Sequence, residues 1–594
     1  MPTYKAPLRD IRFVLHELLQ VAQLTELPGY GEATPDTIDA VLEEAAKLCE
    51  AVLAPLNRTG DEEGCHYENG TVRAPAGFKE AYRVFVEAGW SGLACDPAYG
   101  GQGLPKVLNT AFEEMICSAN LSFGTYPGLS HGAYNALDLH GTDELKARYL
   151  AKLVDGTWSG TMCLTEPQCG TDLGLIRSKA EPGADGAWRI TGTKIFISAG
   201  EHDLTENILH LVLARLPDAP VGIRGISLFL VPKFLVKENG ELGQRNGVAC
   251  GGIEHKMGIK ASATCVMNFE EAAGWLVGKP HKGMSAMFTM MNAARLAVGI
   301  QGLGLAETAY QGARDYAKER LQGRSLAGAK FPGKPADPII VHPDVRRMLL
   351  TMRAYTEGAR ALAYWIGMQL DVAAKHPDTA MRQEADDLVA LMTPIAKAFL
   401  TDSGFDVANL GMQVFGGHGY IRENGMEQLA RDARIAQLYE GTNGIQALDL
   451  VGRKLGTGTG RLLRRFFHPV QAFIEETQGE PPMAEFTLPL LKAFARLQQT
   501  TAWVAQQGLK DPEEAGAAAS DYLRLFALVA IAYMWARMAR IALDKQDGDE
   551  AEFYRAKLAT ARFYMTRLLP QHTAHAAALM AGKAPLMALA AEAF

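Results

Sequence analysis

A short run in the last third of the chain, Tyr439-Glu440-Gly441-Thr442, places one carboxylate on a glycine-containing turn after an apolar stretch. A loop residue with rigid flanking elements can aim its side chain into a cleft. Gly441 has no Cβ, so the backbone can pass close to a ligand there. We predict that Glu440 is a general base. A solvated surface glutamate is the commoner reading of such a turn when it stands alone.

Two earlier segments could serve a ligand beside this carboxylate. Residues 161–172 combine hydroxyl side chains with a proline and a glycine, which suits hydrogen bonding to a polar ring or a phosphate, although an ordinary turn has the same composition. Residues 194–198 form a short β-type run in which Phe196 and Ser198 should share one face, because side chains two apart in a strand point the same way. A half-buried strand with one polar residue is the alternative.

A third segment, residues 413–420, carries several glycines that would allow close backbone approach to a ligand. A break at the end of a helix explains these glycines nearly as well. No segment has the GxGxxG pattern after a strand that marks a dinucleotide-binding Rossmann site.

Length and composition limit the class of protein. A chain of 594 residues exceeds what one hydrophobic core usually serves, so two to four domains are expected. With 48% hydrophobic and 21% charged residues it has the composition of a globular protein. The formal net charge of -8 argues against a nucleic-acid partner, which requires a basic face.

The eight cysteines include no CxxC pair and no histidine at ligand spacing, so we expect no metal site and a reduced, cytoplasmic protein. The N-terminus lacks the pattern of a signal peptide. The most apolar stretch, Leu525 to Ala536, is well short of the ~20 residues that span a bilayer. We therefore predict a buried helix there and no transmembrane segment, with peripheral membrane contact as an alternative.

Periodicity divides the chain into a helical, a β, a helical and an added helical part. Short β-branched or aromatic runs occupy 188–198, 208–213, 225–231 and 264–269, and three long helical segments cover 284–321, 344–374 and 384–412. A flexible Gly/Thr connector spans 456–460. The predicted parts are an N-terminal extension (1–40), a helical domain (41–158), a β-barrel domain (159–280), a helical bundle with Glu440 (281–455) and a C-terminal helical extension (461–594).

In this order and spacing the motifs resemble the acyl-CoA dehydrogenase family. The resemblance covers about residues 40–455 and rests on Cys163 through Pro167 to Asp172, Gln413 through Gly417 to Tyr420, and Arg431 through Arg434 to Tyr439-Glu440-Gly441-Thr442. The chain is also similar to larger members with a C-terminal helical extension, among them 3-methylmercaptopropionyl-CoA dehydrogenases and bacterial long-chain fatty acyl-CoA dehydrogenases.

The resemblance implies an α+β multidomain fold: a helical N-terminal domain, a middle β-barrel, a helical bundle and an extra C-terminal helical domain. It implies a flavoprotein oxidoreductase acting on CH–CH bonds, in which FAD supplies the redox chemistry. Glu440 would remove the α-proton of an acyl-CoA thioester to give the trans-2-enoyl-CoA. We expect a medium- or long-chain fatty acyl-CoA of β-oxidation as substrate. The alternatives are 3-methylmercaptopropionyl-CoA, an acyl-CoA oxidase, and a non-catalytic flavin-binding protein.

The same resemblance assigns the remaining site residues. The implied cofactor contacts are Leu164, Thr165, Gly170, Thr171, Phe196, Ser198, Arg320, Gln322, Gln413, Gly417 and Thr442, and the implied substrate contacts are Arg295, Tyr439 and Gly441. Two departures stand out. Gly323-Arg324 replaces the Phe-Gly that commonly follows the Arg-x-Gln pair, and Ala294 occupies the place where some relatives carry the base.

Partners follow from the resemblance as well. We expect an acyl-CoA substrate, an electron-transfer flavoprotein as electron acceptor, and a homodimer in which the C-terminal extension takes the place of a second dimer. Residues 126–132, read as a turn from their proline and glycines, are expected to face the acyl tail.

Overall fold

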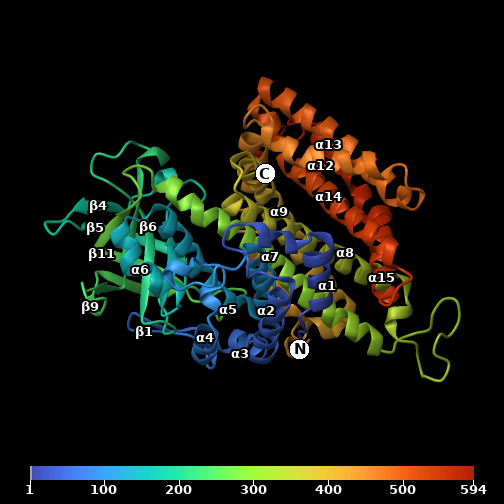
Figure 1. Ribbon diagram of the computed structural model, residues 1–594, viewed down its shortest axis with the longest axis horizontal. Helices are drawn as coiled ribbons and strands as arrows, with labels where there is room; N and C mark the ends of the chain where they lie inside the picture. The colour runs from blue at the N-terminus through green and yellow to red at the C-terminus, as the bar shows by residue number, and fades with distance from the viewer. Residues whose placement is uncertain (1–2) are drawn as a thin grey trace. The chain divides into compact units, whose positions relative to one another are not determined.

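The computed structural model describes residues 3–594, which form two compact units. The helical unit comprises the chain up to Ala46, Pro105–Glu114 and Val298–Phe594. The sheet unit comprises Lys47–Leu104 and Met115–Ala297. Figure 1 shows the strands of the sheet unit in cyan to green and the long helices of the helical unit in green to red.

The sheet unit is built on seven strands, as the short β-branched runs predict. They are β3 (Trp158–Cys163), β4 (Lys179–Pro182), β5 (Trp188–Ser198), β6 (Asn207–Arg215), β7 (Ile226–Pro232), β10 (Val248–Ile253) and β11 (Thr264–Val277). β11, β5, β4, β6 and β7 pair in a closed ring, because β7 joins both β6 and β11. β3 and β10 pair onto this ring at β6 and β11. Closure of the ring confirms the predicted β-barrel.

Helices and two short hairpins complete the sheet unit. They are α3 (Pro55–Glu63), α4 (Phe78–Glu87), most of α5 (Lys106–His140), α6 (Asp143–Val154), the pair β1 (His66–Glu68) and β2 (Thr71–Arg73), and the pair β8 (Phe234–Val236) and β9 (Leu242–Arg245). Many residues of β6 and β7 are fully buried, since both strands lie in the middle of the hydrophobic core.

α5 is two helices joined at Asn120, whose φ of -161° is not helical. The Asn120 Oδ1 accepts a hydrogen bond from the Phe123 N–H at 3.0 Å and so caps the second half. The turn predicted over residues 126–132 is wrong, because this segment lies inside that second helix. Tyr126 is fully buried there and donates to the Ala261 carbonyl at 3.0 Å.

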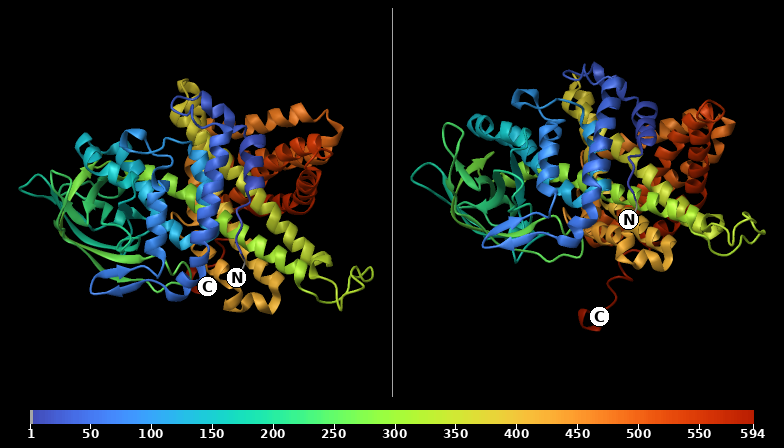
Figure 2. Two further views of the ribbon diagram at one scale, coloured as in Figure 1. Left: turned by 60° about the horizontal axis from the view of Figure 1, so that its bottom comes forward. Right: turned by 90° about the horizontal axis from the view of Figure 1, so that it is seen from below.

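The helical unit contains α1 (Leu8–Arg12), α2 (Pro35–Leu48), α7 (Gly283–Glu319) from Val298 onward, α8 (Pro343–Lys375), α9 (Thr379–Phe415), α10 (Met426–Ala436) and α11 (Asn443–Asp449). α8 packs along α9, and α10 and α11 pack on α9. The three long helices agree closely with the predicted segments, because their apolar residues recur at helical spacing. Figure 2 shows the loop between α7 and α8 extending away from the helices.

The C-terminal extension consists of α12 (Arg461–Thr477), α13 (Ala484–Lys510), α14 (Pro512–Lys545), α15 (Ala551–Phe563) and α16 (His572–Met580). α14 packs against α13, α16, α11 and α8. The Trp535 Nε1–H donates to the Ala354 carbonyl of α8 at 3.0 Å. A Cβ at Gly358 would lie 2.7 Å from Ile531 Cγ2, so this glycine is required for the close approach of α8 and α14.

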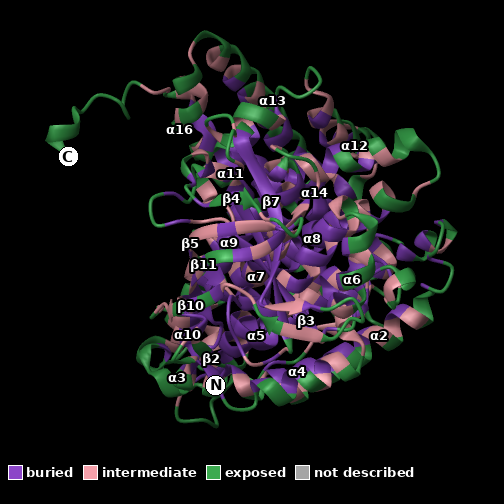
Figure 3. Cartoon of the chain, turned by 90° about the vertical axis from the view of Figure 1, so that its left-hand side faces the viewer, coloured by how far each residue is buried: buried purple, intermediate pink, exposed green. Residues whose placement is uncertain are grey.

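Within the described part of the chain, α14 alone is long and apolar enough to cross a membrane, yet 83% of its most apolar window is buried within the protein. A core helix passes the same test of length and composition. Figure 3 shows the interior elements as mostly buried and the segment leading to the C-terminus as exposed.

Candidate active site

The loop between α10 and α11 carries Glu440 in a left-handed backbone conformation. Its φ is +56°, and that of Gly441 is +82°. A non-glycine residue in this region costs about 1–3 kcal/mol and persists only where its surroundings impose it. The Asn443 N–H donates to the Gln437 carbonyl at 3.2 Å and closes the loop, while the Thr442 hydroxyl donates to the same carbonyl at 3.2 Å. The Glu440 side chain is half-buried.

Gln446, in the first turn of α11, holds the backbone of this loop by hydrogen bonds. Its Nε2 donates to the Glu440 carbonyl at 3.2 Å and to the Gly441 carbonyl at 3.0 Å, and its side chain is fully buried. The Tyr439 hydroxyl donates to the Gln301 side chain of α7. Neither Gln446 nor Gln301 was predicted from the sequence. The available signal for Gln446 was a glutamine that shortly follows the polar turn Gly441-Thr442-Asn443-Gly444.

In the sheet unit, the segment after β3 lies against β5 and brings several predicted cofactor contacts together. The Ile195 N–H donates to the Thr165 carbonyl at 2.9 Å, and the Lys194 Nζ donates to the Leu164 carbonyl at 3.0 Å. A Cβ on Gly170 would lie 3.6 Å from Thr165 Cγ2. Leu164 and Thr165 are half-buried, and Gly170 and its neighbour Thr171 are exposed. Thr165 therefore lies beside the exposed Gly170.

Glu166 anchors this segment from inside. Its carboxylate accepts hydrogen bonds from the backbone N–H groups of Arg177 at 2.6 Å and Ser178 at 3.0 Å, and pairs with Lys194 at 2.8 Å. Burial opposes ionisation of Glu166, but the charge of Lys194 and these hydrogen bonds prevail and lower its pKa to about 2. Neither Glu166 nor Lys194 had a predicted role.

Phe196 departs from regular strand geometry. Its φ is +59°, and the register between β5 and β11 shifts between Lys194 and Ile197. Phe196 and Ser198 were predicted to share one face because side chains alternate along a strand. A bulge interrupts this alternation at Phe196. Phe196 is nevertheless 59% exposed, while Ser198 is half-buried opposite Thr264. An exposed aromatic ring held in a strained conformation is suited to stack on a planar ligand.

Four further predicted contacts gather at one end of the helical unit. Arg320 and Gln322 follow the end of α7, and Gln413 and Gly417 lie at the end of α9. The two ends lie side by side, because Tyr316 of α7 stacks on Phe415 of α9 with ring centroids 4.1 Å apart. All four predicted residues are exposed, and a Cβ on Gly417 would meet nothing within 4 Å.

Arg324, one of the two departures, folds the loop after α7. It donates to the Phe331 carbonyl at 3.1 Å and to the Lys334 carbonyl at 2.6 Å. Asp337 is fully buried in this loop and accepts hydrogen bonds from the N–H groups of Ser325 and Phe331 at 2.9 and 2.8 Å. Gly323-Arg324 therefore serves the loop's own structure.

Arg295, the predicted substrate contact on α7, belongs to the sheet unit and is only 6% exposed. Its guanidinium donates to Asn292 at 3.4 Å and lies 5.8 Å from the Phe288 ring centroid.

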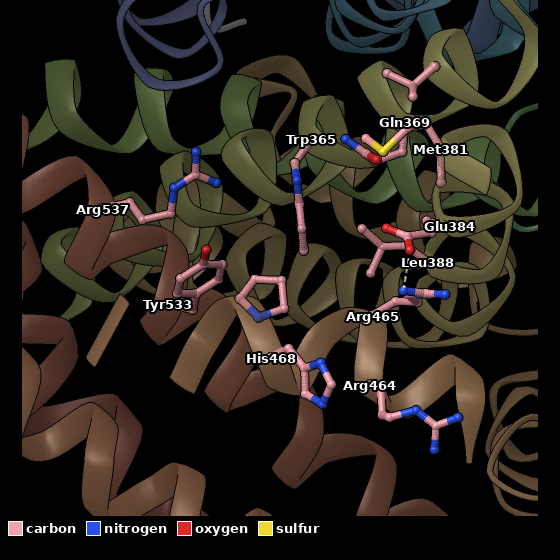
Figure 4. Close-up of a pocket in the computed structure, with 13 residues that line it drawn as sticks. Trp365, Gln369, Met381, Glu384, Leu388, Arg464, Arg465, His468, Tyr533 and Arg537 are labelled. Atoms are coloured by element: carbon pink, nitrogen blue, oxygen red, sulfur yellow. Dashed lines mark ion pairs between the residues drawn. The ribbon is translucent and has the colours of Figure 1, made fainter. Parts of the chain in front are cut away.

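A separate cavity of about 470 Å³ lies within the helical unit, between α8, α9, α12 and α14 (Figure 4). Arg464, Arg465 and Arg537 line it together with Trp365 and Tyr533, and Arg465 pairs with Glu384 at 2.8 Å. None of the predicted site residues lines this cavity. Across residues 3–594, no three His, Cys, Asp or Glu side chains group as metal ligands.

The fold and these motifs define a flavoprotein dehydrogenase, and comparison with known proteins names the family. Profiles of the acyl-CoA dehydrogenase N-terminal, middle and C-terminal domains match residues 35–157, 161–272 and 281–455. A profile described as acetyl-CoA dehydrogenase C-terminal like matches residues 466–590. The chain belongs to the acyl-CoA dehydrogenase family and is an oxidoreductase that acts on the CH–CH bond of acyl-CoA.

Relatives match over nearly the whole chain. It is 46% identical to the 3-methylmercaptopropionyl-CoA dehydrogenase of Ruegeria pomeroyi, over 96% of this chain and 97% of that one. It is 36% identical to the broad-specificity linear acyl-CoA dehydrogenase FadE5 of Mycobacterium tuberculosis, over 96% of each chain. A solved acyl-CoA dehydrogenase of Bacillus anthracis complexed with FAD shares the fold, with a TM-score of 0.75 and 21% identity over 94% of this chain and 90% of that one.

The cofactor of this family is FAD, and the residues expected to hold it fit such a group. The exposed ring of Phe196 offers a stacking face, and Arg320 offers an exposed cation for a diphosphate. Gly170 and Gly417 leave room for close approach, since a Cβ at either position would have no contact shorter than 3.6 Å. The FAD prediction is thus confirmed for the family and consistent with the chain's own residues.

Proposed function

We propose that this chain oxidises a short acyl-CoA thioester to its trans-2-enoyl product, with 3-methylmercaptopropionyl-CoA as the preferred substrate. This proposal is supported by the 46% identity to a 3-methylmercaptopropionyl-CoA dehydrogenase, against 36% to the linear acyl-CoA enzyme. The resemblance alone favoured a medium- or long-chain fatty acyl-CoA. The identities above favour the alternative, 3-methylmercaptopropionyl-CoA, so fatty acyl-CoA becomes the second candidate.

Glu440 carries the proposed mechanism. Its left-handed turn, closed by the Asn443 N–H and held by Gln446, fixes the direction of one carboxylate. Glu440 removes the proton from the carbon α to the thioester, and its backbone N–H stabilises the negative charge that develops on the thioester oxygen. Bound FAD supplies the acceptor for the hydride that leaves the β-carbon.

The remaining roles extend this proposal. Leu164, Thr165, Phe196 and Ser198 contact the flavin, and Gly170 and Thr171 lie near the cofactor and CoA phosphates. Arg320 and Gln322 reach the FAD of the neighbouring subunit, and Gln413 and Gly417 contact its adenosine diphosphate part. Thr442 contacts FAD, and Arg295, Tyr439 and Gly441 contact the acyl-CoA. Electrons pass to an electron-transfer flavoprotein. The enzyme is a cytoplasmic homodimer, and with fatty acyl-CoA it would serve β-oxidation.

An acyl-CoA series tests this function. Purified enzyme is assayed with 3-methylmercaptopropionyl-, butyryl-, octanoyl- and palmitoyl-CoA and a ferrocenium acceptor, with and without oxygen. The highest kcat/KM is expected for 3-methylmercaptopropionyl-CoA, and a maximum at octanoyl-CoA or longer would contradict the substrate proposal.

Oxygen consumption at a comparable rate would favour an oxidase, and a folded, colourless protein that takes up no FAD would favour the non-catalytic alternative. Light scattering tests the dimer, and a stable tetramer would contradict it.

A further inference from the structure

Asp402 of α9 joins the two ends of the loop that carries Glu440. Its Oδ1 accepts a hydrogen bond from Gln437 Nε2 at 2.8 Å and from Asn443 Nδ2 at 2.7 Å. Gln437 directly follows α10 and Asn443 begins α11. One carboxylate oxygen therefore holds the entrance and the exit of the loop together.

The other oxygen of Asp402 forms an ion pair with a residue of the C-terminal extension. Asp402 Oδ2 accepts from Arg524 of α14 at 3.0 Å. The Asp402 side chain is 19% exposed and that of Arg524 is 51% exposed. A partly buried carboxylate with three charged or amide donors is held more firmly than a surface pair.

The preceding turn of α9 also binds Asn443. The Lys397 Nζ, which is fully buried, donates to Asn443 Oδ1 at 2.8 Å, and Asn443 Nδ2 also donates to the Ala398 carbonyl at 3.2 Å. The Asn443 amide is thus oriented by a cation at its oxygen and by Asp402 at its nitrogen. Only this orientation of the Asn443 amide places its oxygen against a donor and its nitrogen against an acceptor.

We propose that Asp402 is a positioning residue for Glu440 and that Arg524 gives the C-terminal extension a part in the same task. This inference rests on the proposed role of Glu440 as base. Glu440 occupies a strained conformation at φ +56°, so releasing the loop ends lets its backbone relax and turns its carboxylate away. A displacement of about 1 Å at a reacting group can lower turnover about a hundredfold.

Asp402→Asn in the FAD-loaded, full-length enzyme tests the first part. The substitution keeps one acceptor oxygen, but its new NH2 group faces donors. We expect kcat to fall about 10- to 100-fold while KM and flavin content stay within about threefold of the wild type, because the loss falls on the reacting geometry and not on binding. The thermal midpoint is measured in parallel, so that a general loss of folding is recognised.

Arg524 variants test the part played by the extension. Only one guanidinium nitrogen contacts Asp402, so Arg524→Lys should keep kcat within about twofold, whereas Arg524→Gln should lower it about three- to tenfold. Arg540→Gln is the matched control. Arg540 lies on the same helix but pairs with Glu476 and Glu480, so its loss should leave kcat within about twofold. Equal kcat values for Arg524→Gln and Arg540→Gln would overturn the role of the extension.

A double substitution separates this inference from the proposed function. In a Glu440→Gln background no base is left to position, so adding Asp402→Asn should change the residual rate less than about twofold. If Glu440→Gln alone keeps wild-type turnover, the proposed base is wrong and the inference falls with it. If Glu440→Gln loses turnover but Asp402→Asn does not, or if Asp402→Asn lowers the residual rate by the same factor in both backgrounds, Asp402 does not act through Glu440.

Discussion

The Lys194 Nζ lies 2.8 Å from Glu166 Oε1, and both side chains are almost completely buried. Lys194 also donates to the Leu164 carbonyl at 3.0 Å, so the ion pair lies directly beneath the turn proposed to contact the flavin. A buried ion pair is a weak source of net stability, but removing one partner leaves an uncompensated charge. The pair therefore makes the geometry of this turn sensitive to the ionisation of Glu166.

We predict that acid weakens the folded state through Glu166. Its pKa is lowered from 4.5 to about 2, so ionised Glu166 stabilises the fold above pH 4.5 and this contribution disappears as pH falls toward 2. The free energy of unfolding, measured by urea denaturation between pH 7 and 3, should fall less steeply in Glu166→Gln than in the wild type. Glu181, an exposed glutamate in the same unit, provides the control Glu181→Gln. Parallel pH profiles for the wild type and Glu166→Gln would contradict this prediction.

Phe196→Ala should weaken FAD binding. Loss of one stacking face is worth about 1 kcal/mol, which is about a fivefold higher Kd. Phe196→Trp, which keeps an aromatic face, should bind FAD within about twofold of the wild type. Flavin fluorescence titration of the apoprotein measures these values. Leu175→Ala is the control, since Leu175 is similarly exposed at 56% in the same unit. Equal Kd values for all four proteins would show that Phe196 does not contact the flavin.

The architecture was predictable wherever one periodicity runs without interruption. β5 and β7, and the long helices α7, α8 and α9, fall close to their predicted bounds. Residues 126–132 were read as a turn from Pro127 and the neighbouring glycines, but Asn120 starts a new helix that carries them. The cap and the burial of Tyr126 decide the conformation of this segment, and neither is visible in local composition.

Site residues within a local motif were predictable from the sequence. Residues that contact the site from a distant part of the chain were not. Glu440 stands out because its turn composition is unusual for a helical region. Asp402 lies in the middle of α9, 35 residues before Gln437, and nothing in the local sequence indicates that they meet. The bulge at Phe196 likewise depends on the register with β11, which is a long-range property.

Lys557 should be essential for docking the C-terminal extension. This fully buried lysine of α15 pairs with Asp10 of α1 and lies 2.6 Å from Glu357 of α8. Arg360, also buried, pairs with the same Asp10 and with Glu114. Lys557→Met leaves two buried carboxylates without this cation, so we expect a loss of about 3–5 kcal/mol in the free energy of unfolding.

Arg555→Gln provides the control for Lys557→Met on the same helix. Its side chain is 62% exposed and pairs with an exposed Asp547, so its loss should cost less than about 1 kcal/mol. Urea denaturation followed by circular dichroism measures both variants. Similar small losses would show that the buried cation contributes no more than a surface pair.

Glu440→Gln should lower kcat at least about a hundredfold, the usual scale for loss of a general base. The amide keeps the size of the side chain, and the Gln446 contacts to the Glu440 and Gly441 carbonyls involve only the backbone, so the loop should keep its conformation. FAD content and the affinity for acyl-CoA, measured by flavin absorbance on titration, should therefore match the wild type. Glu423→Gln, a substitution outside this loop, should leave kcat within about twofold. Turnover by Glu440→Gln within tenfold of the wild type would show that another group removes the α-proton.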